Sequence, residues 1–258
     1  LHTDIAVSEA WTPIAGFAGV LDGNGKTLTV NYSGSDEQAG IFATLDGTVK
    51  NLRVAGSFTT TATAKVTLGA VAGKLGEKAQ IVGCTNTAGI AMNVDASGTT
   101  VIGGIFGQGA AGNVIADNTN EGRITVRRKT PGDAAAVAGV GGWAYSDVTG
   151  CVNKGEIRYS DEVSAAKAVY VGGVLGRLDI GKGYVVEGCR NEAPVTLATA
   201  QAANNLLGGI AAYANGENRD TPNTIRNCEN RGDVLADAPV SDKAKTGQAR
   251  MGGICGGT

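Results

Sequence analysis

The chain has 258 residues, and its 22 Lys and Arg residues against 24 Asp and Glu residues give a formal net charge of −2. This balance gives no electrostatic support for nucleic-acid binding, which needs a basic surface against the phosphate backbone. The 41 glycines argue against long helices, and the single histidine, His2, excludes a serine–histidine catalytic relay and a histidine-based metal site. We therefore expect no metal and no cofactor.

The first segment, residues 1–38, differs from the rest of the chain and is expected to form a starting coil. Within it, Leu21-Asp22-Gly23-Asn24-Gly25-Lys26-Thr27 is typical of a strand, a tight turn and a second strand. Asp22 and Asn24 also suggest a calcium loop, but the twelfth position of such a loop is Ser33 and not the required glutamate. The turn is the favoured interpretation.

From residue 39 onward the chain repeats a motif of two small residues followed by an apolar residue, with a step of about 34 residues. The clear copies are Gly103-Gly104-Ile105, Gly172-Gly173-Val174, Gly208-Gly209-Ile210 and Gly252-Gly253-Ile254, and the looser copies are Ala39-Gly40-Ile41, Gly69-Ala70-Val71 and Ala138-Gly139-Val140. A repeat of this length indicates a solenoid. We expect residues 39–258 to form the repeats of a single domain that spans residues 1–258.

A second motif, Cys-x-Asn-x-Gly-x-apolar, follows the glycine motif and is complete at Cys151 to Ile157 and at Cys228 to Val234. Aligning the copies gives a cysteine column, Cys84, Cys151, Cys189 and Cys228, and an asparagine column, Asn86, Asn120, Asn153, Asn191 and Asn230. Stacked strands lie about 4.8 Å apart, wider than the Cβ separation of about 3.8 Å in a disulfide. We therefore expect free thiols in the first column and an internal ladder of amide hydrogen bonds, at a bend, in the second.

Each copy also contains three short β-branched stretches separated by turn residues. In the fifth copy these are Val169-Tyr170-Val171, Tyr184-Val185-Val186 and Val195-Thr196-Leu197. Such stretches predict strands. We predict an all-β fold, a right-handed parallel β-helix of about seven coils with about 34 residues and three strands per coil.

The last copy breaks off at Gly252-Gly253-Ile254-Cys255-Gly256-Gly257-Thr258. An uncapped coil exposes open strand edges. We therefore expect the natural chain to continue past Thr258, or the open coil to make end-to-end contact with another chain. The sequence contains no apolar run of about 18 residues, so we expect no membrane insertion by this segment.

The sixth residue of the glycine motif forms a polar and aromatic column, Lys74, Gln108, Trp143, Arg177 and Tyr213, and the residue two positions later forms a second column, Gly76, Ala110, Tyr145, Asp179 and Asn215. In stacked coils the aromatic rings lie beside Arg and Asp side chains, an arrangement that suits sugar stacking and hydrogen bonding to hydroxyl groups. The candidate carbohydrate-binding residues are Trp143, Tyr145, Arg177, Asp179, Tyr213 and Asn215. The alternative is an exposed turn whose residues vary freely.

Two further functions compete with glycan binding. One is a purely structural stalk that holds another domain away from the cell. The other is a polysaccharide lyase or a glycoside hydrolase, whose chemistry needs suitably placed carboxylates, for example a pair at a fixed separation. Asp147 and Asp179 are the nearest candidates, and the alignment does not place them together.

The order of these motifs resembles the GLUG-type Gly-rich repeat proteins of bacteria. The resemblance begins with Trp11 to Thr27 and continues through Gly40-Ile41-Phe42-Ala43-Thr44-Leu45, Val49-Lys50-Asn51-Leu52-Arg53-Val54 and the glycine and cysteine motifs. It covers nearly the whole chain, with Asn118 in place of Cys and Ala193 in place of Gly as departures. It implies a pectin-lyase-like β-helix on the cell surface or secreted, an adhesin-like role, a glycan or surface protein as partner, and no transferable catalytic residues.

Overall fold

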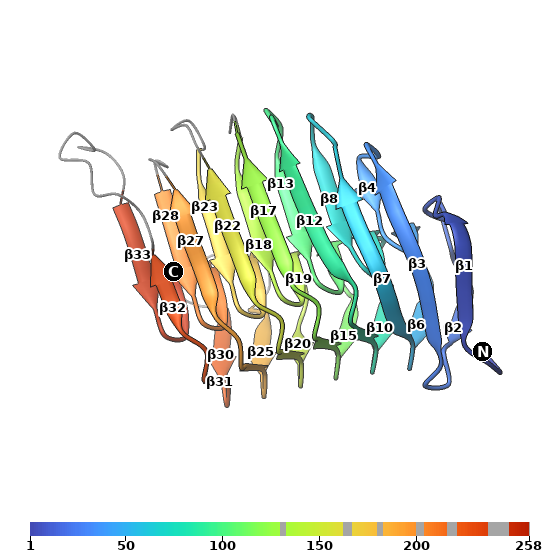
Figure 1. Ribbon diagram of the computed structural model, residues 1–258. Helices are drawn as coiled ribbons and strands as arrows, with labels where there is room; N and C mark the ends of the chain where they lie inside the picture. The colour runs from blue at the N-terminus through green and yellow to red at the C-terminus, as the bar shows by residue number, and fades with distance from the viewer. Residues whose placement is uncertain are drawn as a thin grey trace.

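The computed structural model is an elongated stack of parallel strands, the architecture of a parallel β-helix (Figure 1). It describes residues 1–129, 133–161, 167–179, 183–199, 204–215, 221–236 and 248–257. Within these ranges the chain forms strands and no helix. The described part therefore offers no apolar helix of the length needed to span a bilayer.

Four sheets run along the stack, and three of them take one strand from each coil. The β2 sheet contains β2 (Val20–Asp22), β6 (Thr48–Lys50), β10 (Gln80–Val82), β15 (Val114–Ala116), β20 (Val148–Thr149), β25 (Val185–Glu187) and β30 (Thr224–Arg226). The β4 sheet contains β4 (Gln38–Ala39), β8 (Val66–Gly69), β13 (Thr100–Gly103), β18 (Ala135–Ala138), β23 (Val169–Gly172), β28 (Asn204–Gly208) and β33 (Gln248–Gly252). The β5 sheet contains β5 (Phe42–Leu45), β9 (Ala72–Leu75), β14 (Phe106–Gln108), β19 (Gly141–Ala144), β24 (Leu175–Leu178), β29 (Ala211–Ala214) and β34 (Cys255–Gly257).

The fourth sheet, the long sheet, has 13 strands because most coils contribute two. Its longer strands are β1 (Ile5–Ala10), β3 (Thr27–Gly34), β7 (Arg53–Thr60), β12 (Gly89–Val94), β17 (Ile124–Arg128), β22 (Ile157–Asp161), β27 (Val195–Thr199) and β32 (Val234–Ala236). Its two-residue strands are β11 (Thr85–Asn86), β16 (Thr119–Asn120), β21 (Val152–Asn153), β26 (Arg190–Asn191) and β31 (Glu229–Asn230).

The sequence-based count of three strands per coil was therefore wrong, because a complete coil such as β15 to β19 has five. The pattern of β-branched stretches did not predict two kinds of strand. A two-residue strand is too short to show alternation, and the strands of the β5 sheet, which follow the glycine bend closely, were not counted as strands of their own. The first copy is one residue shorter at the glycine bend. Ala39 pairs with Leu68 before the bend and Phe42 with Ala72 after it, so the alignment of Ala39-Gly40-Ile41 with Gly69-Ala70-Val71 holds after the bend and is one residue out of register before it.

The interior is filled by apolar columns that repeat from coil to coil. One column joins Val49, Ile81, Ile115, Val148 and Val186 through consecutive in-register pairs. All five side chains are buried. Each contributes about 1.5–3 kcal/mol on burial, so this column alone is a substantial part of the core.

The asparagine column forms a continuous amide ladder through the same interior. Nδ2 of Asn86 donates to Oδ1 of Asn120 at 2.8 Å, and the contact repeats from Asn120 to Asn153 at 2.8 Å, from Asn153 to Asn191 at 2.7 Å and from Asn191 to Asn230 at 2.7 Å. Each Nδ2 also donates to the carbonyl oxygen two residues later in its own coil. Buried amides cost free energy unless they are paired, and here the stack itself pairs them.

The glycine motif is explained by this ladder, because the second glycine of the pair lies against it. A Cβ atom on Gly173 would lie 2.5 Å from Cγ of Asn191 and 2.0 Å from the carbonyl oxygen of Gly209. The same collision occurs at Gly104 with Asn120 and at Gly139 with Asn153. The two sequence motifs are thus the two sides of one contact across the interior.

Left-handed backbone occurs at the corner that precedes the cysteine column and not at the ladder. The corner residues are Asn51, Gly83, Asp117, Gly150, Gly188 and Asn227, with φ between 52° and 65°. The ladder asparagines instead lie in two-residue strands, whose extended backbone directs their amides into the core. The expected bend therefore lies a few residues earlier in the chain.

The cysteine column carries free thiols that are mostly buried. Burial raises the pKa of the Cys84 thiol to about 11, and a hydrogen bond with the Cys151 thiol together with burial raises the pKa of Cys189 to about 12. These thiols stay protonated at neutral pH, and a protonated thiol is a poor nucleophile. The column thus acts as packing.

Asn118 replaces cysteine in this column and uses its amide to bind backbone. Its Oδ1 accepts from the backbone N–H of Cys84 at 2.9 Å, and its Nδ2 donates to the carbonyl oxygen of Ile81 at 2.8 Å. Both partners belong to the preceding coil, so the substitution adds hydrogen bonds between coils.

Replacing Gly173 with Ala is expected to lower the free energy of unfolding by about 1–3 kcal/mol, because the new methyl group overpacks the ladder. Gly89→Ala is the matched control, because a Cβ at Gly89 meets no atom within 4 Å. Urea denaturation followed by circular dichroism measures both variants. Equal stability of the two variants would contradict the ladder contact.

Replacing Asn153 with Ala is expected to lower the free energy of unfolding by about 3 kcal/mol, because it leaves a buried donor on Asn120 and a buried acceptor on Asn191 unpaired. The control is Asn93→Ala, which removes an exposed amide and should stay within about 0.5 kcal/mol of the parent protein. The same urea titration measures both, and a small effect of Asn153→Ala would show that the ladder contributes little.

Candidate functional site

A row of outward-facing side chains runs across the β5 sheet, one residue from each coil. In-register pairs join Thr44 to Lys74, Lys74 to Gln108, Gln108 to Trp143, Trp143 to Arg177 and Arg177 to Tyr213. We call these six residues the strip. All are partly or fully exposed. The β-helix thus turns residues about 34 positions apart in the sequence into direct neighbours.

Arg177 is the centre of the strip and is surrounded by three aromatic rings. Its guanidinium carbon lies 4.3 Å from the centroid of the Trp143 ring, 5.5 Å from that of Tyr213 and 5.6 Å from that of Tyr170. These distances are within the range of cation–π interaction. The guanidinium is therefore held between rings from three coils and two sheets.

Asp179 fixes this arrangement from the same strand end. Its Oδ1 accepts from Nη2 of Arg177 at 2.8 Å, and its Oδ2 accepts from Nε1 of Trp143 at 3.1 Å. The Arg177 and Asp179 side chains are only 21% and 13% exposed. The one carboxylate thus neutralises the charge of the guanidinium and also orients the indole ring.

Tyr145 extends the aromatic surface beside Trp143. The two rings lie with their centroids 5.9 Å apart and their planes within 10° of parallel. Burial, the negative charge of Asp179 and a hydrogen bond with Asp179 raise the pKa of the Tyr145 phenol to about 12. The phenol therefore stays protonated, and able to donate a hydrogen bond, at all physiological pH values.

Side chains of the strip contact outward side chains of the β4 sheet at the corner where the two sheets meet. Oγ1 of Thr44 donates to Oε1 of Gln38 across this corner at 2.7 Å, and the rings of Tyr170 and Tyr213 lie 5.5 Å apart across it. Outward residues of the β4 sheet such as Ala136 are buried there. Side chains of the strip are therefore held in place by packing against the β4 sheet.

Five of the six candidate residues meet in this cluster: Trp143, Tyr145, Arg177, Asp179 and Tyr213. Asn215 is fixed through its backbone, since its N–H donates to Leu178 O at 3.3 Å and its carbonyl oxygen accepts from Asn223 Nδ2. Sequence reasoning missed Tyr170, which comes from the β4 sheet and not from the motif column. Alternation in Val169-Tyr170-Val171 places its side chain outside the core, and that signal could have identified it.

Asp147 and Asp179, the two acidic residues considered for catalysis, have different hydrogen-bond partners. Asp179 is engaged by Arg177 and Trp143, whereas Oδ1 of Asp147 accepts from the backbone N–H of Val185 at 2.8 Å, at the start of the β25 strand. Among the described residues, no three His, Cys, Asp or Glu side chains are grouped to hold a metal ion.

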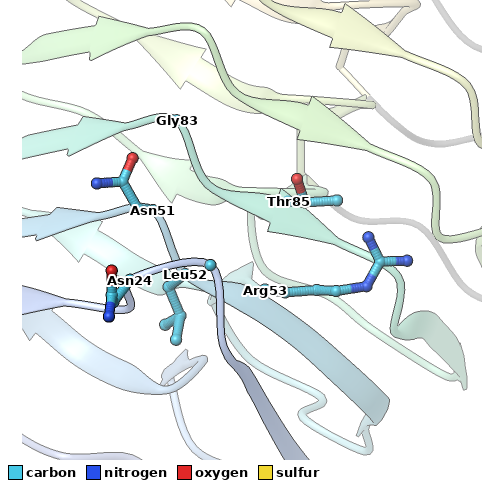
Figure 2. Close-up of a pocket in the computed structure, with 7 residues that line it drawn as sticks. Asn24, Asn51, Leu52, Arg53, Gly83 and Thr85 are labelled. Carbon is cyan, nitrogen blue, oxygen red and sulfur yellow. The ribbon is translucent and has the colours of Figure 1, made fainter. Parts of the chain in front are cut away.

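A depression of about 370 Å³ lies away from the strip, near the N-terminal end of the stack. It is lined by Asn24, Gly25, Asn51, Leu52, Arg53, Gly83 and Thr85. Asn24 and Asn51 lie at one end of it, and Arg53 and Thr85 at the other (Figure 2). Its lining residues come largely from corners that turn the chain.

The Asp22 segment beside this depression is a turn. Oδ1 of Asp22 accepts from the N–H of Asn24 at 2.9 Å, and its Oδ2 pairs with Nζ of Lys50 at 3.3 Å. The hydrogen bond from Asn24 is the main cause that lowers the pKa of Asp22. A carboxylate that a lysine already neutralises is a poor calcium ligand, so the strip remains the better candidate site.

No protein family, curated protein or solved structure matches the chain. The geometry of the strip is therefore the main indication of function.

Tyr145 gives a pH test of this geometry. Because the folded protein holds the phenol proton more tightly than the unfolded chain, its stabilising contribution is complete below pH 10.0 and is lost as the pH rises through about 12. Asp179→Asn should move the Tyr145 pKa down toward its ordinary value, though not fully, because burial remains. Phenolate absorbance, taken as the difference between each protein and its Tyr145→Phe variant, measures the shift, and an unchanged pKa would place Asp179 away from the phenol.

Proposed function

We propose that the protein is a non-catalytic, GLUG-type β-helical scaffold, displayed on the cell surface or secreted, that acts in an adhesin-like way by binding glycans at the strip. The observation that carries this proposal is the cluster in which Arg177 lies between Trp143, Tyr170 and Tyr213 and is paired with Asp179. The regular rod beneath it serves equally as a stalk that presents the strip.

The chemistry of the cluster fits a sugar. Ligand sites combine apolar and aromatic surface with a few well-placed polar groups, and a sugar ring offers both C–H faces and hydroxyl groups. Trp143 and Tyr145 supply adjacent aromatic surface, and the partly exposed side chain of Gln108, next to Trp143 in the strip, supplies an amide.

The cluster is also preorganised, which favours binding. Side chains held by stacking and hydrogen bonds lose little conformational entropy when a ligand arrives. Trp143 is fixed by the bond from its Nε1 to Asp179 and by Arg177 against its ring, and all three residues stand on strands or strand ends of one rigid stack. The scaffold therefore presents its rings in one geometry.

Binding of the protein to a glycan array tests the proposal. Trp143→Ala is expected to abolish the signal of any bound glycan, because it removes the largest aromatic surface of the strip. Thr125→Ala, which changes an outward residue of the long sheet, is the control and should leave the signal unchanged. An unchanged signal for Trp143→Ala, or no bound glycan at all, would contradict the proposal.

A further inference from the structure

The charges of the strip and of the column beside it balance one another. These two columns contain two cationic side chains, Lys74 and Arg177, and two carboxylates, Asp46 and Asp179. At the centre of the cluster, Nη2 of Arg177 and Oδ1 of Asp179 form an ion pair at 2.8 Å, and both side chains are mostly buried. An acidic sugar would have to break this pair to reach the guanidinium, so the site favours an uncharged ligand.

The rings of Tyr213 and Trp143 have different neighbours. Tyr213 has Arg177 on one side and Tyr170 against it on another, so its faces are largely occupied. Trp143 has Arg177 over its ring at 4.3 Å and stacks with Tyr145 at 5.9 Å, and its neighbour in the preceding coil of the strip is Gln108. Arg177 occupies the strip on the Tyr213 side of Trp143, whereas Gln108 and Lys74 on the other side are partly and fully exposed. A ligand that contacts Trp143 therefore continues toward Gln108 and Lys74.

The remaining residues in that direction form a suitable path. Thr44, Lys74 and Gln108 follow Trp143 in consecutive register, one per coil. With a strand spacing of about 4.8 Å, the six strip residues span about 24 Å along the rod. These polar side chains offer hydrogen bonds at regular intervals to the hydroxyl groups of an extended chain.

We propose that the strip binds an uncharged, extended polysaccharide that lies along the rod axis and runs from Trp143 toward Lys74. This inference rests on the proposed glycan-binding function and adds the ligand class, the direction of the chain and the residues that it contacts.

Isothermal titration with cello-, manno- and xylo-oligosaccharides, from disaccharide to hexasaccharide, tests the ligand class and its length. Affinity for at least one series is expected to rise with chain length and to change little between low and high salt, because no net charge is neutralised. Oligogalacturonides and heparin fragments, the acidic probes, should bind more weakly. Tighter binding of an acidic probe, strong salt dependence or no binding of any neutral series would overturn the inference.

Gln108→Ala tests the direction of the chain. It should weaken binding of the hexasaccharide about tenfold, which corresponds to about 1.4 kcal/mol, and affect the disaccharide much less. Thr125→Ala, which changes an outward residue of the long sheet, is the control and should change neither the affinity nor the length dependence. If Trp143→Ala abolishes binding but the parent protein binds oligosaccharides of all lengths with equal affinity, the proposed function stands and this inference fails.

Asp179→Asn tests the charge balance directly, because it leaves the guanidinium of Arg177 without its carboxylate partner. The variant is expected to gain salt-sensitive binding of oligogalacturonides that the parent protein lacks. Asp147→Asn, which removes a carboxylate that accepts from Val185, is the matched control. Circular dichroism establishes that both variants are folded, and an unchanged preference in folded Asp179→Asn would overturn the proposed role of charge.

Discussion

The stacking of like residues in successive coils is the constraint on which the rest of the structure depends. Parallel pairing at about 4.8 Å holds each side chain next to its counterpart from neighbouring coils, so a residue must be compatible with itself or with a close substitute. Apolar columns meet this condition by burial. Asparagine meets it because one carboxamide can both donate and accept, and glycine because two backbones must approach where the ladder leaves no room for a Cβ.

Much of the fold could be predicted from the sequence because this constraint makes similar residues recur at a regular spacing along the chain. The spacing of the glycine and cysteine motifs indicates parallel coils, and the structure confirms a parallel β-helix. The number of strands per coil could not be read in the same way, because β16 and its equivalents have only two residues. Nor could the sequence show that Gly173 and Asn191 lie opposite each other, since that contact depends on how the coil folds across its interior.

The sequence predicts which site residues are neighbours within one column of the rod, but not which residues of different columns come together. Column alignment brings Trp143, Arg177 and Tyr213 together because they occupy equivalent positions. Tyr170 belongs to another column, and only the angle between the β4 and β5 sheets brings it to the same guanidinium. The availability of each ring face likewise depends on side-chain packing, so the sequence treats Trp143 and Tyr213 as equivalent whereas their surroundings differ.

The amide ladder has one further property, its direction. Every carboxamide from Asn86 to Asn191 donates toward the next coil, so the bond dipoles point the same way and polarise one another. Asn86 begins the ladder, and its Oδ1 accepts from the N–H of Ala88 at 2.9 Å. A coil inserted in the reverse orientation would set two donors or two acceptors face to face. The interior thus carries an electrical polarity along the rod, and each coil of the ladder has to present its amide in the same sense.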